Sequence, residues 1–238
     1  MANGVVNQHI SKQFDDELEN VRGKVLAMGG LVEQQLNNAI KSLIDGDIDL
    51  GTTVIETEVQ VNSYDVSIDQ ECTKILARRQ PAASDLRLVM AITKTITDLE
   101  RVGDEAEKIA KMGLELTDKQ GPKSYYVGIN AMGNLVSQLL HEALDAFARM
   151  DSKKAVEVAG KELESDDQYV AILRQLITYM MEDPRNISGA LDAVWVARAL
   201  ERIGDHSRNI CENIIYLVEG KDVRHTSIKY MEEIVFDN

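Results

Sequence analysis

The chain is poor in several residue types that define common classes of protein. Its 238 residues include three prolines, two cysteines and one tryptophan, and aromatic residues make up 5%. So few prolines permit long helices, because proline breaks a helix interior. Cys72 and Cys211 lie far apart and have no paired spacing typical of zinc ligands or of a disulfide framework. We therefore expect both cysteines to be small buried side chains.

Positive charge is also scarce. The chain has 26 basic and 40 acidic residues, which gives a net charge of −14. A nucleic-acid-binding protein needs a basic surface, and an anionic membrane surface would repel this chain. The composition therefore argues against nucleic acid as a partner and favours cations or basic protein surfaces.

Long hydrophobic runs are absent as well. The longest uncharged apolar run covers residues 25–32, far short of the ~20 residues that a membrane-spanning helix needs. The N-terminal sequence MANGVVN lacks the basic start and apolar core of a signal peptide. We expect a cytoplasmic protein without a transmembrane segment.

The most informative feature that is present is an internal duplication. The sequence LERVGD at residues 99–104 recurs as LERIGD at residues 200–205. A second pair of similar segments, 28–39 and 132–143, has seven identical positions in twelve. The halves of the chain are therefore predicted to be two copies of one structural unit.

Each half has the pattern of long amphipathic helices. Apolar residues recur at steps of three and four over residues 14–43, which marks one face of a helix. Pro81 and Pro184 interrupt the pattern at similar places in the two halves. We predict an all-α fold of two tandem three-helix bundles, with domains at 8–118 and 125–220 and a C-terminal tail at 221–238. The helices predicted in the second half cover residues 126–150, 152–182 and 187–219.

The duplicated motif places two carboxylates on one helix face in each half. Glu and Asp four residues apart repel each other by about 0.2–0.5 kcal/mol, and a glycine between them costs about 1 kcal/mol relative to alanine. A hairpin of the second and third helices brings further oxygen donors to the same level. The eight predicted ligands are Glu58, Asn62, Glu100 and Asp104 in the first half and Glu162, Asp166, Glu201 and Asp205 in the second.

Such a set of oxygen donors is suited to a hard divalent cation such as Mg²⁺, Mn²⁺, Ca²⁺ or iron, rather than a structural zinc ion. Because Asn62 stands where the second half has an acid, the second half is expected to hold the more complete site. The alternative is a solvated acidic face, screened by Arg101 and Arg202. His206, next to Asp205, is a further candidate ligand through a ring nitrogen.

The sequence offers little support for catalysis. None of the four histidines follows a glutamate by three residues, so the Glu-x-x-His pairs of di-iron bundles are missing. No phosphate-binding loop, dinucleotide-binding glycine pattern or Ser/His/Asp grouping is found. We therefore predict that the protein is not an enzyme.

The motifs are similar to those of a known family. The paired LER[VI]GD motifs, the segment RQPAASDLR at 79–87 and the segment DHSRNI at 205–210 resemble the PhoU family of phosphate-signalling regulators. The resemblance extends from about His9 to His225.

The resemblance implies a cytoplasmic, non-enzymatic homodimer. Its implied partners are the nucleotide-binding subunit of the phosphate ABC transporter and a sensor histidine kinase. It also implies negative regulation of the phosphate-starvation response, modulation of phosphate uptake, and metal sites at the Glu-xxx-Asp motifs. The metal is left open among iron, manganese, magnesium and zinc.

Two other functions stay open from the residues alone. One is a metal-dependent enzyme built on a bundle of carboxylates. The other is a purely structural helical scaffold whose acidic residues only keep its surface hydrated.

Overall fold

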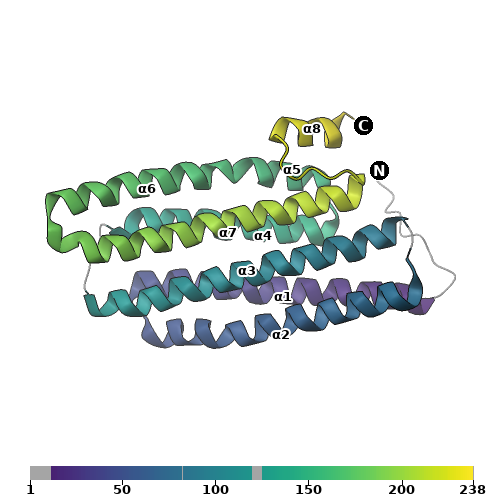
Figure 1. Cartoon of the computed structure of the whole chain (residues 1–238), viewed down its shortest axis with the longest axis horizontal. Coiled ribbons are helices and arrows are strands. Elements are labelled where there is room, and N and C mark those ends of the chain that lie inside the picture. The colour runs from purple at the N-terminus through teal and green to yellow at the C-terminus, as the bar shows by residue number, and fades with distance from the viewer. Residues whose placement is uncertain (1–11, 82, 120–124, 238) are drawn as a thin grey trace.

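The structure, a computed structural model, describes residues 12–81, 83–119 and 125–237. It is an all-α protein of two bundles (Figure 1), as predicted. The first bundle contains α1 (Lys12–Asp45), α2 (Ile48–Arg79) and α3 (Ala83–Lys119). The second contains α4 (Tyr125–Arg149), α5 (Ser152–Lys161), α6 (Leu163–Glu182), the 3-10 turn η1 (Pro184–Asn186) and α7 (Ile187–Glu219). A short helix, α8 (Ile228–Phe236), follows.

The turn after the first helix of each bundle has the same local structure twice. Asp47 and Asp151 cap the following helices by accepting hydrogen bonds from backbone N–H groups three residues later, each at 3.0 Å. The residue before each cap has a positive φ, of 68° at Gly46 and 53° at Met150. Glycine adopts this conformation without strain, whereas methionine does not. The turn therefore has the same conformation in both bundles, although Met150 stands in the second where the first has Gly46.

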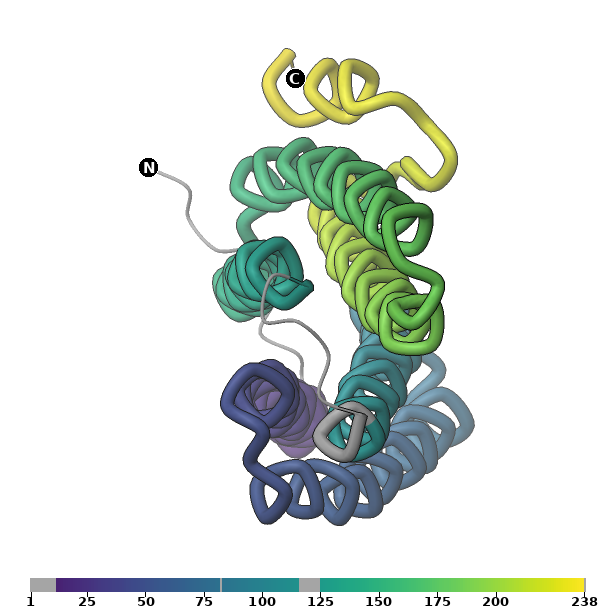
Figure 2. Tube along the Cα trace, turned by 90° about the vertical axis from the view of Figure 1, so that its left-hand side faces the viewer, coloured from purple at the N-terminus to yellow at the C-terminus, as the bar shows by residue number. Residues whose placement is uncertain are grey.

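The two bundles pack against each other through α1 with α4 and α3 with α7, as the end-on view in Figure 2 shows. The contact between α1 and α4 is reciprocal. The side chain of Leu144 lies on Gly29, and that of Ile40 lies on Gly133, each filling the space of a missing Cβ. Both glycines belong to the duplicated segments 28–39 and 132–143, so equivalent residues meet across an approximate twofold axis.

Polar groups join α3 to α7. Asp98 of α3 accepts hydrogen bonds from Asn209 (3.1 Å) and Asn213 (3.3 Å), and one of its oxygens lies 3.0 Å from Nδ1 of His206. Farther along, Arg202 Nη1 pairs with the buried carboxylate of Glu105 at 2.8 Å. The seam between the bundles thus combines close packing on Gly29 and Gly133 with polar contacts that include those between α3 and α7.

The prediction of one continuous helix over residues 152–182 is wrong. The structure interrupts it at Glu162, which separates α5 from α6. Gly160 lowers the helix propensity just before the break by about 1 kcal/mol relative to alanine. The turn is closed by a hydrogen bond from Ser165 N to Glu162 O at 2.8 Å. The equivalent helix of the first bundle, α2, is unbroken.

The predicted tail contains α8, which the sequence analysis did not anticipate. This helix packs on α5, outside the second bundle (Figure 1). Its apolar side chains Met231, Ile234 and Val235 are buried. The predicted domain limits remain predictions, and the first of them, residue 8, lies outside the described residues.

The core is built mostly from aliphatic side chains, with a few aromatic ones such as Phe147, and both cysteines are buried in it, as expected. Among the helices that the structure describes, none carries an apolar stretch long enough to cross a membrane.

Glu142 of α4 makes strong electrostatic contacts within the second bundle. Its carboxylate lies 2.8 Å from Lys154 Nζ and 3.0 Å from Lys161 Nζ, and it accepts a hydrogen bond from Gln138. The bond from Lys154 is the main reason why the pKa of Glu142 falls from 4.5 to about 2. Because the folded pKa is lowered, this stabilisation is present above pH 4.5 and is lost as the pH falls toward 2.

We expect Glu142→Gln to lower the free energy of unfolding at pH 7 by about 1–2 kcal/mol, since charge-assisted hydrogen bonds are lost. Urea denaturation at several pH values measures the effect, which should shrink between pH 4.5 and pH 2. Glu157→Gln is the matched control. Its carboxylate is more exposed and lies 3.7 Å from Lys154 Nζ, so we expect a change below about 0.5 kcal/mol. A pH-independent loss in Glu142→Gln would contradict the assignment.

Candidate functional site

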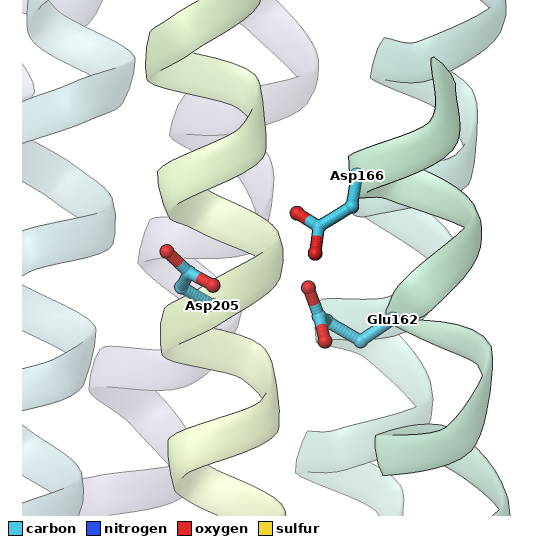
Figure 3. Close-up of side chains that lie close together, drawn as sticks. All are labelled: Glu162, Asp166 and Asp205. Carbon is cyan, nitrogen blue, oxygen red and sulfur yellow. The ribbon is translucent and has the colours of Figure 1, made fainter. Parts of the chain in front are cut away.

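Three carboxylates converge in the second bundle, between α6 and α7. Glu162 and Asp166 lie one turn apart at the start of α6, and Asp205 faces them from α7 (Figure 3). One oxygen from each of the three side chains lies within 4.8 Å of the others. They are the only group of three or more acidic, histidine or cysteine side chains within the described residues that converges in this way.

The glycine of the second motif allows this convergence. A Cβ on Gly204 would lie 2.6 Å from Oγ of Ser165 and 3.8 Å from Cγ of Glu162. The bare backbone of α7 therefore lets the start of α6 approach closely. This contact explains why a residue that weakens a helix occurs in the middle of α7.

The electrostatics of this site favour a bound cation. Burial, followed by the neighbouring carboxylates, raises the pKa of Glu162 and of Asp205. Glu162 is 1% exposed, and its Oε1 is buried without a hydrogen-bond partner. Its other oxygen lies 3.3 Å from Nη1 of Arg208. A buried carboxylate oxygen without a hydrogen-bond donor destabilises the folded protein. A divalent cation at this point would remove that destabilisation.

Glu201, the fourth ligand predicted in this half, does not join the group. It forms an ion pair with Arg198, one turn earlier on α7. Its Oε2 is nevertheless buried without a hydrogen-bond partner, and burial raises its pKa. Glu201 thus lies beside the three converging carboxylates, held by an arginine that the sequence analysis did not consider.

His206 is directed elsewhere. Its Nδ1 lies 3.0 Å from Asp98 on α3, so it belongs to the polar seam between the bundles. Its proposed role as a nitrogen ligand has no support from this arrangement.

The first bundle has a different arrangement around the equivalent glycine. Glu58 of α2 is buried, and its Oε2 accepts a hydrogen bond from Nε2 of Gln35 at 2.9 Å. A Cβ on Gly103 would lie 2.8 Å from the same Oε2. The glycine of each motif therefore faces a glutamate side chain of the preceding helix, Glu58 in the first bundle and Glu162 in the second.

The remaining predicted ligands of the first bundle do not complete a cluster. Asn62 is exposed. Arg101 lies 3.4 Å from Glu100 and 3.3 Å from Asp104, and so neutralises part of their charge. Burial and the charge of Asp104 raise the pKa of Glu100. Within the described part of this bundle, no three acidic side chains converge as in the second.

Gln35 is a residue of this site that sequence reasoning missed. It lies on the apolar stripe of α1, next to Leu36, and is buried. A polar residue on a predicted core stripe was the available signal, because a buried amide needs a partner. That partner is Glu58.

Comparisons with known proteins agree with the duplication. The family described as "PhoU domain" matches residues 25–112 and again residues 129–214. The chain belongs to the PhoU family. The two PhoU matches contain the two glycine motifs and all eight predicted ligands.

PhoU relatives cover almost the whole chain. The phosphate-specific transport system accessory protein PhoU homolog of Pseudomonas aeruginosa is 51% identical over 98% of this chain and 96% of that relative. The Escherichia coli K12 accessory protein PhoU is 48% identical over 97% of this chain and 95% of that protein.

Solved PhoU structures have the same fold. The crystal structure of PhoU from P. aeruginosa has a TM-score of 0.86 at 52% identity and covers 88% of this chain and 100% of that chain. The phosphate transport system regulatory protein PhoU from Streptococcus pneumoniae has a TM-score of 0.82 at 32% identity, covering 89% and 99%.

Proposed function

We propose that this protein is an accessory regulator of a phosphate transport system. The observation that carries the proposal is the pair of PhoU domains, together with relatives of nearly the same length that are named accessory proteins of phosphate-specific transport. A S. pneumoniae PhoU of the same fold is described as a regulatory protein of phosphate transport.

In this proposal the protein is a cytoplasmic adaptor and acts as a homodimer. It binds the nucleotide-binding subunit of the phosphate ABC transporter and a sensor histidine kinase, modulates uptake, and keeps the phosphate-starvation response off when phosphate is plentiful. The net charge of −14 favours basic surfaces on both partners.

We also propose that Glu162, Asp166 and Asp205 hold one divalent cation. Their oxygens suit Mg²⁺, Mn²⁺ or iron better than zinc, which prefers nitrogen and sulfur ligands. The cation would connect α6 to α7 and offset the repulsion among three carboxylates. This role is structural or regulatory, and it requires no reaction.

A deletion experiment tests the regulatory role. We expect removal of the gene to leave alkaline phosphatase expression high in phosphate-rich medium, because the repressing adaptor is gone. A plasmid carrying the intact gene should restore repression to the parental level. Unchanged repression in the deletion strain would refute the proposal.

A further inference from the structure

A polar cavity lies on the seam between α3 and α7. Its volume is about 680 Å³, within the range of about 300–1,000 Å³ that is usual for small-molecule sites. Its lining comes from α3, from the second half of α7 and from the segment that follows α7, and it shares only Asp205 with the three converging carboxylates. Three separate parts of the chain therefore meet at one cavity.

The lining of this cavity reverses the charge balance of the chain. Acidic residues outnumber lysine and arginine by 40 to 26 in the whole sequence. The cavity is instead lined by four basic and three acidic residues, and by two of the four histidines of the chain. The four basic residues are Lys94, Arg202, Arg208 and Arg224. Such a group is unexpected on a protein of net charge −14.

The arginines of α7 are oriented by carboxylates that use only part of their donor capacity. Arg202 Nη1 lies 2.8 Å from Glu105, and Arg208 lies 3.3 Å from both Glu162 and Glu212. A guanidinium has five N–H donors on three nitrogen atoms. These ion pairs engage one nitrogen of Arg202 and two of Arg208. The carboxylates therefore fix the direction of each arginine and leave N–H groups for a ligand.

The segment after α7 adds Arg224 and His225 to the lining. It turns back along the bundle before α8 (Figure 1), and Val223 within it is fully buried. Asp222 accepts hydrogen bonds from the backbone N–H (3.1 Å), Nε (3.0 Å) and Nη2 (2.6 Å) of Arg224. His225 has a φ of 62°, which is uncommon for a residue other than glycine. The buried valine and the contacts of Asp222 thus hold this turn against the cavity.

Lys94 of α3 is held by an aromatic ring rather than by a carboxylate of the described residues. Its Nζ lies over the ring of Tyr216, 5.0 Å from the centroid. A ring attracts a cation but carries no net charge to neutralise it. The pKa of Asp222 is lowered to about 2, mainly by the hydrogen bond from Arg224, and the charge of Lys94 contributes to this lowering. Lys94 and Arg224 therefore act on the same carboxylate, although they belong to α3 and to the tail.

Two of the three acidic residues of the lining are already bound by protein donors. Asp98 accepts hydrogen bonds from Asn209 and Asn213, and its Oδ1 also lies 3.0 Å from Nδ1 of His206. Glu212 pairs with an arginine of its own helix. The third acid belongs to the group of three carboxylates. The acids therefore position the donors of the lining more than they repel an anion.

The duplication does not account for this lining. The spacing of the two LER[VI]GD motifs relates residues of α3 to residues of α7. By that spacing, the positions equivalent to Asp98 and His206 are Ala199 and Glu105. The hydrogen-bonded group around Asp98 is therefore particular to one end of the seam between α3 and α7.

We propose that this cavity binds the phosphate group of a small molecule, either inorganic phosphate or a phosphorylated metabolite. A phosphate group carries about two negative charges and three terminal oxygens, so it can accept from several donors at once. Arginine binds such oxygens in pairs, and lysine acts as a point charge. The cavity supplies both from three parts of the chain. A single carboxylate would leave more of these donors without a partner.

Isothermal titration calorimetry of the full-length protein tests the proposal. The probes are inorganic phosphate, pyrophosphate and ATP, at pH 7 and constant ionic strength, in buffer freed of metal by a chelating resin. We expect saturable binding with a dissociation constant below about 1 mM, and at least tenfold weaker binding of citrate, a polycarboxylate. Tighter binding of ATP than of inorganic phosphate would identify a phosphorylated metabolite as the ligand, and the reverse order would identify inorganic phosphate.

Variants of the lining locate the binding. The double substitution Lys94→Gln and Arg224→Gln should weaken binding at least tenfold, because two cationic donors are lost. Lys153→Gln combined with Arg185→Gln is the matched control and changes the net charge equally. Lys153 lies over an aromatic ring and Arg185 pairs with an aspartate two residues earlier, as Lys94 and Arg224 do, but neither lines the cavity. Circular dichroism verifies that both double variants are folded.

Proton NMR of the histidines gives a readout that needs no change to the lysines and arginines. His206 and His225 line the cavity. His141 lies 3.0 Å from Glu33 of α1 and serves as the internal control. We expect pyrophosphate to shift the imaging-independent C2–H signals of His206 and His225 at constant pH and to leave that of His141 unchanged.

Several results would overturn the proposal. They are no saturable binding of any probe, equally tight binding of citrate, equal losses in the two double variants, or unchanged signals of both cavity histidines. The site is argued from the cavity and does not rest on the regulatory function proposed above. Phosphatase repression without ligand binding would refute only the cavity, and ligand binding without repression would refute only the regulatory function.

Discussion

Gly103→Ala is expected to lower the free energy of unfolding by about 2 kcal/mol, although alanine is the better helix former by about 1 kcal/mol. A Cβ at this position would lie 2.8 Å from Oε2 of Glu58 and 3.2 Å from both Oε1 of Gln35 and Cγ1 of Val61. These groups are buried, and Gln35 and Glu58 share a hydrogen bond. Moving them disturbs a packed region, and overpacking of this kind costs about 1–3 kcal/mol. Urea denaturation at pH 7 measures the change.

Gly30→Ala is the matched control. Gly30 lies in α1 and is exposed, and a Cβ added there would have nothing within 4 Å. This substitution should therefore raise the free energy of unfolding by up to about 1 kcal/mol. Glu58→Ala removes the carboxylate that the new Cβ at position 103 would meet. Glu58→Ala should therefore lower the free energy of unfolding less in the Gly103→Ala variant than in the original protein. Equal effects at Gly103 and Gly30 would contradict close packing at the motif glycine.

The double substitution Asp166→Asn and Asp205→Asn should remove most of the stabilisation of the protein by divalent metal. If the intact site binds Mn²⁺, a concentration one hundred times the dissociation constant adds about 2.7 kcal/mol to the free energy of unfolding. Loss of two of three carboxylates should weaken metal binding at least about 100-fold. Even substitution of residues that only hold metal ligands in place lowers metal affinity by about 10–100-fold. The remaining stabilisation is then about 0.4 kcal/mol or less at the same concentration.

Without metal, the same variant should be at least as stable as the original protein. Each asparagine keeps the shape of the aspartate and removes a negative charge from a site where the pKa of Glu162, Glu201 and Asp205 is raised. Thermal unfolding with and without Mn²⁺, together with metal analysis of protein purified without chelators, measures both effects.

Asp104→Asn in the first bundle serves as the control for the metal experiment. Asp104 lies in the equivalent motif but pairs with Arg101, and we expect stabilisation by Mn²⁺ to persist in this variant. Stabilisation that survives in the Asp166 and Asp205 double variant, or that disappears in Asp104→Asn, would place the cation elsewhere. Absence of any metal effect on the original protein would favour a scaffold without a metal site.

The repeated motif made much of the fold predictable. The steps of three and four between apolar residues identified the face of α1 that is buried, from Phe14 to Leu43. The acids of the second half were predicted at the correct level of the hairpin, because Pro184 sets where the chain turns back. Three of those four side chains converge in the structure.

Other features could not be predicted from local pattern. The break at Glu162 depends on a small difference in helix propensity over a few residues. The packing of α8 on α5, the helix that ends at this break, was not predicted either. The pairing of Glu201 with Arg198 instead of with the other acids depends on the direction of one long side chain.

The sequence by itself determined that the chain is two copies of a helical unit, and which face of each long helix is apolar, because periodicity and duplication are properties of the chain order. Only the tertiary structure decided which acidic residues meet. Convergence depends on how closely two helices approach, and here that distance is set by a missing side chain at Gly204 against Ser165. It also decided that the equivalent glutamate of the first bundle is bound by Gln35, a contact between residues distant in sequence that no local pattern specifies.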